Sequence, residues 1–210
     1  GATANDYNIK WDGTTLTLKG ATIIADNSHS GIEYSGTSAI TIQLEGENTV
    51  TGDFGIEGRY AAKLTISGSG TLNVNGDSSA IYAGGNIEIS DATVNATSTK
   101  SDGINTYGGD IIINSGKVTV ECKDDGLNAS DGNVVINGGT VSVDSGGYGV
   151  DIIKSLTIRG GTVTIEADTQ LINTKNGTVT IAPQGDAKIA VKAGDSKGNA
   201  VGITIPDDGI

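Results

Sequence analysis

The chain has 210 residues, the size of one large domain, and its 33 glycines against only two prolines exclude proline-rich disorder and favour a regular, turn-rich fold. It carries 13 Lys and Arg against 25 Asp and Glu, and this acidic balance excludes nucleic acid as a partner because it repels phosphate backbones. The chain has no apolar run of about 18 residues, which predicts no membrane insertion, and its single cysteine, Cys122, forms no internal disulfide.

The sequence repeats itself in eight similar segments, with a step of roughly 23 residues. Each segment opens with two Leu, Ile or Val residues separated by one other residue, and a second, mostly aliphatic pair follows after a short turn. This period-two alternation is typical of strands that bury one face. The first pairs are Leu16/Leu18, Ile42/Leu44, Leu64/Ile66, Ile87/Ile89, Ile111/Ile113, Val134/Ile136, Leu156/Ile158 and Val179/Ile181.

A third, shorter apolar element ends each segment, so each repeat holds three short strands. Such a unit cannot close its own core and must stack on its neighbours, whereas propeller blades need about 40 residues or more. The predicted fold is all-β: one domain over 1–210, a right-handed parallel β-helix of about eight coils with three short strands per coil. We expect an N-terminal cap at 1–13, repeat coils over 14–183 and an irregular C-terminal coil and cap at 184–210.

Stacked repeats would place equivalent residues in columns on the outside of the coils. The position after the third-strand apolar residue is acidic, amide or aromatic in seven successive repeats, which predicts a polar edge along the solenoid. Its members are Glu33, Glu57, Tyr82, Asn105, Asn128, Asp151 and Asn173.

Three aspartates precede the third strands of two adjacent repeats, in the strings SDGI and DDGL. Carboxylates stacked about 5 Å apart repel one another, and Ca²⁺, which takes six to eight oxygen ligands, would relieve that repulsion. The predicted metal ligands are Asp102, Asp124 and Asp125. Two alternatives remain open: Lys100 and Lys123 could neutralise the acids, and Asp before Gly is also common in ordinary turns.

Aromatic residues are scarce, and most of them fall near this same edge. Aromatic faces beside carboxylates and amides suit sugar rings, whose C–H faces stack while their hydroxyls find polar partners. The alternative is that the rings pack on one another between coils. The predicted carbohydrate-binding residues are Tyr34, Tyr82, Asn105, Tyr107, Asn128, Tyr148 and Asp151.

The amino-acid sequence of the repeats resembles that of a family of bacterial cell-surface carbohydrate-binding domains. The phrases that carry the likeness are YNIKWDGTTLTLKGATI, ITIQLEGENTVTG, LTISGSGTLNV, SDGINTYGGDIIINSG and DDGLNASDGNVVINGGTVSV. The resemblance implies a right-handed parallel β-helix, an extracellular location at the cell surface or as a secreted protein, binding of plant cell-wall or microbial polysaccharide, and calcium as a structural or binding ion.

The fold also resembles that of polysaccharide lyases, which would make Lys100, Lys123, Lys154 or Arg159 a candidate base. A base needs a lowered pKa, and exposed lysines beside carboxylates have the opposite environment. We therefore expect a non-catalytic, calcium-assisted polysaccharide-binding adhesin module rather than an enzyme. The alternatives are a calcium-dependent, pectate-type lyase and a structural adhesin stalk with a protein partner.

Overall fold

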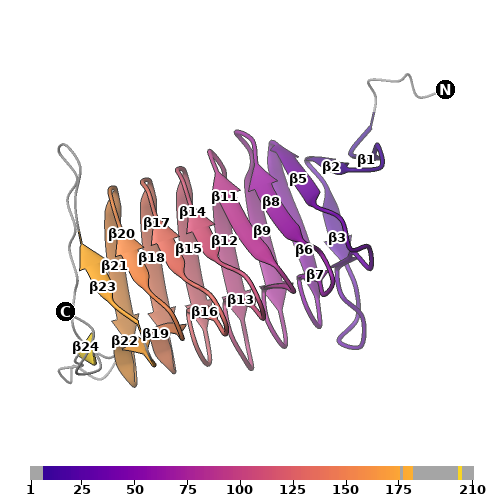
Figure 1. Ribbon diagram of the computed structural model, residues 1–210. Coiled ribbons are helices and arrows are strands. Elements are labelled where there is room, and N and C mark those ends of the chain that lie inside the picture. The colour runs from indigo at the N-terminus through magenta and orange to yellow at the C-terminus, as the bar shows by residue number, and fades with distance from the viewer. Residues whose placement is uncertain (1–6, 176, 182–202, 205–210) are drawn as a thin grey trace.

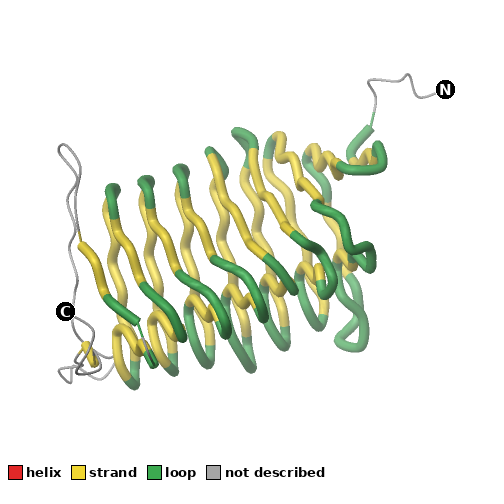
Figure 2. Tube along the Cα trace, viewed as in Figure 1, coloured by secondary structure: helices red, strands yellow, loops and turns green. Residues whose placement is uncertain are grey.

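The protein is a solenoid of parallel strands in the computed structural model, which describes residues 7–175, 177–181 and 203–204 (Figure 1). The described residues form strands, turns and loops without a helix (Figure 2). None of them belongs to a helix with the length and apolarity that crossing a bilayer requires. The predicted C-terminal coil and cap at 184–210 lies outside the described residues, apart from one short strand at Ile203–Thr204.

Three sheets run along the solenoid, and each coil contributes one strand to each sheet. Sheet A has the order β1 (Ile9–Trp11), β2 (Thr15–Lys19), β5 (Ile40–Glu45), β8 (Lys63–Ser67), β11 (Asn86–Ser90), β14 (Ile111–Ile113), β17 (Val134–Ile136), β20 (Leu156–Ile158) and β23 (Val179–Ile181). Sheet B has the order β3 (Thr22–Ile24), β6 (Glu47–Gly52), β9 (Thr71–Gly76), β12 (Thr93–Ser98), β15 (Lys117–Cys122), β18 (Thr140–Ser145) and β21 (Thr162–Ala167).

Sheet C has the order β4 (Ile32–Glu33), β7 (Ile56–Gly58), β10 (Ile81–Ala83), β13 (Ile104–Thr106), β16 (Leu127–Ala129), β19 (Tyr148–Ile152), β22 (Gln170–Thr174) and β24 (Ile203–Thr204). The described residues thus hold seven complete coils, with β23 and β24 belonging to a further one. The predicted all-β parallel solenoid of about eight coils with three strands per coil is confirmed. Figure 1 shows the coils in chain order, from indigo β2 at one end to orange β23 at the other.

Register follows the sequence repeat, because equivalent residues of successive coils are partners in the ladders. In sheet C, Ile81 pairs with Ile56 on one side and with Ile104 on the other. Apart from the antiparallel pair of β1 and β2, the pairings of the described strands are parallel. A parallel stack places the same side chain every ~4.8 Å along the axis, so columns read from the sequence are columns in space.

The core consists of the aliphatic residues that alternate along each strand. Ile66, Ile89 and Ile113 are fully buried, and each is the partner of the next in sheet A. Period-two alternation turns these residues inward and leaves polar residues outward, so hydrophobic burial selects one register in each coil.

The corner between sheets A and B requires a left-handed residue in every complete coil. Six of the seven positions are glycines with positive φ: Gly20, Gly46, Gly68, Gly116, Gly139 and Gly161. The fourth coil has Asp91 instead, at φ 60°, and its carboxylate accepts a 2.8 Å hydrogen bond from the Ser115 hydroxyl. Aspartate is one of the few non-glycine residues that tolerates this conformation, since its short side chain bonds locally.

Candidate functional site

The polar column predicted from the sequence exists on sheet C. Tyr82 lies beside Glu57 and Asn105, and Asn128 lies between Asn105 and Asp151 in the strand pairings. These positions face away from the core because they alternate with fully buried partners such as Ile104 and Leu127. Successive parallel strands therefore present one polar side chain each, with the spacing of the strands.

The middle of the column is pre-ordered by hydrogen bonds between coils. The Asn128 amide nitrogen lies 3.3 Å from Oδ2 of both Asp102 and Asp125, and its oxygen accepts a 3.1 Å bond from the Ser130 hydroxyl. Further along, Asn173 donates a 2.7 Å hydrogen bond to Asp151. The Lys175 amine lies 3.8 Å from the other Asp151 oxygen. These bonds hold the polar groups in fixed positions before any ligand arrives.

The three predicted metal ligands come together at the entrance to β13 and β16. One carboxylate oxygen from each of Asp102, Asp124 and Asp125 lies within 4.8 Å of the other two. Asp102 and Asp125 are buried, at 5% and 9% exposure, whereas Asp124 is exposed. The turns before two adjacent strands stack in register, so the fold itself creates this cluster.

Each buried aspartate also binds the main chain of the next coil. Asp102 Oδ1 accepts a 3.2 Å bond from the Asp125 N–H, and Asp125 Oδ1 accepts a 2.8 Å bond from the Tyr148 N–H. Asn105 donates to the second oxygen of Asp102. The carboxylates thus have a structural role in the turns, as the alternative reading of the Asp-Gly pattern expected, and they retain free lone pairs because a carboxylate offers about four acceptor sites.

The trio is electrostatically strained. Burial, followed by the charges of Asp102, Asp124 and Asp151, raises the pKa of Asp125 to about 6. Burial also raises the pKa of Asp102, with Asp124 and Asp151 contributing repulsion. Lys100 does not neutralise the trio, since its amine lies 2.8 Å from Asp77. Two buried carboxylates beside a third one favour the binding of a proton or a cation.

Cys122 lies beside the aspartate trio and is partly buried against the core. Its thiol lies 3.4 Å from the main-chain oxygen of Asp124, and burial raises its pKa to about 12. The thiolate is the reactive form of cysteine, so this side chain behaves as a small apolar residue rather than a nucleophile.

The aromatic residues divide into packed and exposed groups. Tyr82 packs on Phe54 with ring centroids 5.6 Å apart, and the Arg59 guanidinium lies 5.9 Å from the Tyr82 ring centre. This is the packing between coils that the sequence left open as an alternative. Tyr107, by contrast, is 71% exposed where the chain leaves β13. Tyr148 opens β19 and is half-buried.

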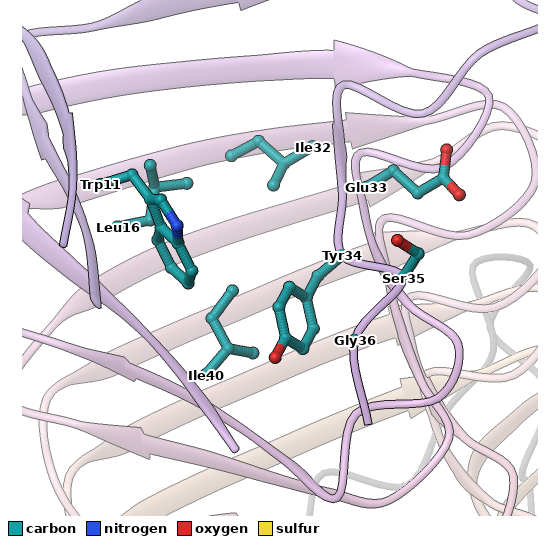
Figure 3. A pocket seen from close by; sticks show the side chains of 8 residues that line it. All are labelled: Trp11, Leu16, Ile32, Glu33, Tyr34, Ser35, Gly36 and Ile40. Carbon is teal, nitrogen blue, oxygen red and sulfur yellow. The ribbon is translucent and has the colours of Figure 1, made fainter. Parts of the chain in front are cut away.

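Tyr34 lies away from the outer column, because it alternates with Glu33 and turns toward the end of the core. Its ring centroid is 6.2 Å from that of Trp11, at an interplanar angle of 53°. The two rings line a pocket of about 340 Å³ (Figure 3). Trp11 was not among the predicted site residues, although a lone tryptophan directly before an Asp-Gly turn, in YNIKWDG, was a visible signal.

A nucleophilic triad is not formed around the chain's one histidine. Asp26 and Ser28 both lie near the same ring nitrogen of His29, at 2.8 and 3.0 Å. In a Ser-His-Asp triad, the acid and the nucleophile bind different ring nitrogens. The arrangement is instead an exposed turn, in which hydrogen bonding to Asp26 raises the pKa of His29.

The parallel β-solenoid thus presents a pre-ordered polar column with exposed aromatic rings along one face. The sequence matches a family described as "Carbohydrate-binding domain-containing protein" over residues 7–210. The chain belongs to this family. The predicted resemblance to a carbohydrate-binding β-helix family is confirmed, and carbohydrate is the class of partner that the family implies. No curated protein and no solved structure matched the chain.

Proposed function

We propose that the chain is a non-catalytic adhesin module that binds plant cell-wall or microbial polysaccharide along the outer column of sheet C, at a cell surface or as a secreted protein. Calcium held by the aspartate trio assists this binding. The family relation supports a carbohydrate partner, and the column supplies the surface on which a chain of sugars can lie.

The observation that carries the proposal is the repeat of the column. Asn105, Asn128 and Asp151 are partners on successive strands, so a hydrogen-bonding group recurs every ~4.8 Å. This spacing is close to the advance of one pyranose ring in an extended glycan. A glycan running along the solenoid axis would therefore meet one polar side chain per sugar, and the exposed ring of Tyr107 beside the column offers a stacking face.

The aspartate trio fits a calcium ion by the chemistry of its donors. All three ligands are carboxylate oxygens, which a hard cation prefers. Burial raises the pKa values of Asp102 and Asp125, and the neighbouring carboxylates add repulsion that a cation would relieve. Three carboxylates fill only part of a shell of six to eight oxygens, so water or glycan oxygens would complete it. Bound there, the ion would supply positive charge that attracts acidic or hydroxyl-rich sugars.

Exposed Asp124 gives solvent access to this cluster. Extracellular calcium modules work with dissociation constants of about 0.1–1 mM, and an open site with few protein ligands belongs in that class. A site of that affinity would be occupied in the calcium-rich exterior of cells, where we propose that the chain acts.

Three of the four candidate bases, Lys100, Lys154 and Arg159, do not resemble a lyase base. A base needs a pKa near the working pH, whereas hydrogen bonding to Asp77 raises the pKa of Lys100. Lys154 donates a 2.9 Å hydrogen bond to the main-chain oxygen of Asp131, and Arg159 donates one to Asn137. These contacts support the non-catalytic reading.

Affinity electrophoresis tests the proposed function. The full chain is run in native gels that contain pectin, cellulose derivatives or xylan, with millimolar calcium or with a chelator. Slower migration in at least one glycan, stronger with calcium, is the expected result. Unchanged migration in every glycan would overturn the proposal and favour a stalk that binds a protein, and unsaturated products released from polygalacturonate would favour the lyase.

A further inference from the structure

The N-terminal end of the solenoid carries a second place suited to a sugar. β1 runs antiparallel along β2, with Ile9 opposite Leu18 and Trp11 opposite Leu16. Because Leu18 is fully buried, its partner Ile9 and the alternating Trp11 lie on the core side of the sheet, over the end of the first coil. Trp11 nevertheless remains 48% exposed. An indole held on a strand beside an open space is a pre-formed binding face.

The pocket beside Trp11 has the size and lining of a small-ligand site. Its volume of about 340 Å³ is at the small end of the range for such sites, about 300–1,000 Å³. In Figure 3, the apolar side chains of Trp11, Leu16 and Ile40 gather on one side of Tyr34, and those of Glu33 and Ser35 lie on the other. The pocket therefore offers an apolar face and a polar rim to one ring-sized ligand.

The Tyr34 ring keeps its place because residue 36 is a glycine. A Cβ at Gly36 would lie 2.4 Å from the Tyr34 hydroxyl and 2.5 Å from the adjoining ring carbon. No φ restriction applies at this residue, so the space for the ring, rather than the backbone conformation, is what glycine provides. Substitution of Gly36 would move the tyrosine without removing an aromatic group.

We propose that this N-terminal pocket binds one uncharged pyranose ring at the end of a glycan chain, as a subsite at the end of the solenoid where the sheet C column begins with Glu33. The inference rests on the proposed carbohydrate-binding function. The sugar's C–H face would pack on Trp11 and Tyr34, and its hydroxyls would bond to Glu33 and Ser35. Glu33 and the net charge of −12 disfavour a uronate at this place.

Fluorescence of Trp11 tests the proposal directly, because Trp11 is the single tryptophan of the chain. The full chain is titrated with short cello-, xylo- and manno-oligosaccharides and, separately, with oligogalacturonates. The expected result is a saturable emission change and reduced acrylamide quenching with a neutral oligosaccharide. If none of them alters the emission, or if only oligogalacturonates do, the proposal is overturned.

Three variants connect the signal to the pocket. Tyr34→Ala and Gly36→Ala should each weaken neutral-sugar affinity about tenfold, since they remove or displace one stacking ring. Ile9→Ala is the matched control, on the same strand and face as Trp11 with the same 48% exposure, and should leave affinity unchanged. Equal losses in all three variants, at unchanged melting temperature, would overturn the pocket assignment.

The two proposals fail separately. If glycan gels retard the chain but neutral oligosaccharides do not change its Trp11 emission, the proposed function of sheet C stands and the pocket proposal is overturned. A chain that is retarded in no gel would lose the proposed function, whatever Trp11 reports.

Discussion

The N–H of Asp125 donates a hydrogen bond to the carboxylate of Asp102, its equivalent one coil earlier, over 3.2 Å. This bond anchors the Asp102 carboxylate to the Asp125 main chain, and the Tyr148 N–H anchors the Asp125 carboxylate over 2.8 Å, so the strand stack holds the two buried carboxylates close together. Their repulsion is therefore a built-in property of the fold. Binding of a cation or of a proton would relieve this repulsion, and the next two predictions concern these two cases.

Millimolar calcium should raise the melting temperature of the chain, because an ion that binds the folded state stabilises it, by about 1.4 kcal/mol at ten times the dissociation constant. Asp124→Asn should abolish this rise without lowering the calcium-free stability, since Asp124 is exposed and its charge repels Asp102 and Asp125. Thermal melts with calcium and with chelator measure both effects. Asp131→Asn, in an exposed residue outside the trio, should retain the full rise. A calcium-independent melting curve for the parent would remove the ion from the site.

Without calcium, Asp125→Asn should stabilise the chain at pH 7 by up to roughly 3 kcal/mol, because burial raises the pKa of Asp125 from 3.8 to about 6. The folded state holds this proton more tightly than the unfolded state, so the contribution of Asp125 to stability falls as pH rises from 4 to 7. The stability difference between variant and parent should therefore vanish near pH 4. Denaturant melts in chelator at both pH values test this, and a variant less stable than the parent at pH 7 would contradict it.

Gly139→Ala should destabilise the chain by about 2 kcal/mol, because Gly139 has φ +85° and a Cβ there would lie 2.5 Å from the Gly116 carbonyl. Gly138→Ala is the matched control, one residue earlier without positive φ, and its Cβ would lie 3.1 Å from the nearest carbonyl. It should cost clearly less free energy of unfolding. Equal losses in the two variants would show that the corner does not depend on a left-handed residue.

The strand stack was predictable because the repeat fixes the register. Once Ile81 and Ile104 are recognised as equivalent, their pairing in sheet C follows, and so do the column and the aspartate trio. The direction of long side chains was not predictable in the same way. Lys100 falls in the coil of Asp102, yet its flexible stem reaches Asp77 in the coil before.

The N-terminal pocket was not predictable because it lies where the repeat stops. Its residues come from β1, β2, β4, β5 and the loop between β4 and β5, and β1 has no equivalent in the other coils. The sequence predicts Tyr34 as a carbohydrate-binding residue near the outer edge, but period-two alternation turns its side chain inward beside Trp11. At this end of the solenoid, contacts between unlike elements decide the site, and periodicity contains no information about them.

The migration of the Tyr107→Ala variant in a glycan-containing gel, compared with that of the parent, tests most directly whether the sheet C column binds the polysaccharide. Tyr107 is 71% exposed beside the column, and Ile24 on the outside of sheet B is 75% exposed, so Ile24→Ala is the control for loss of a large exposed side chain. Tyr107→Ala should weaken apparent affinity about three- to tenfold, and Ile24→Ala should migrate like the parent. Full retention of Tyr107→Ala together with weakened binding of Ile24→Ala would place the glycan on sheet B and contradict the proposed surface.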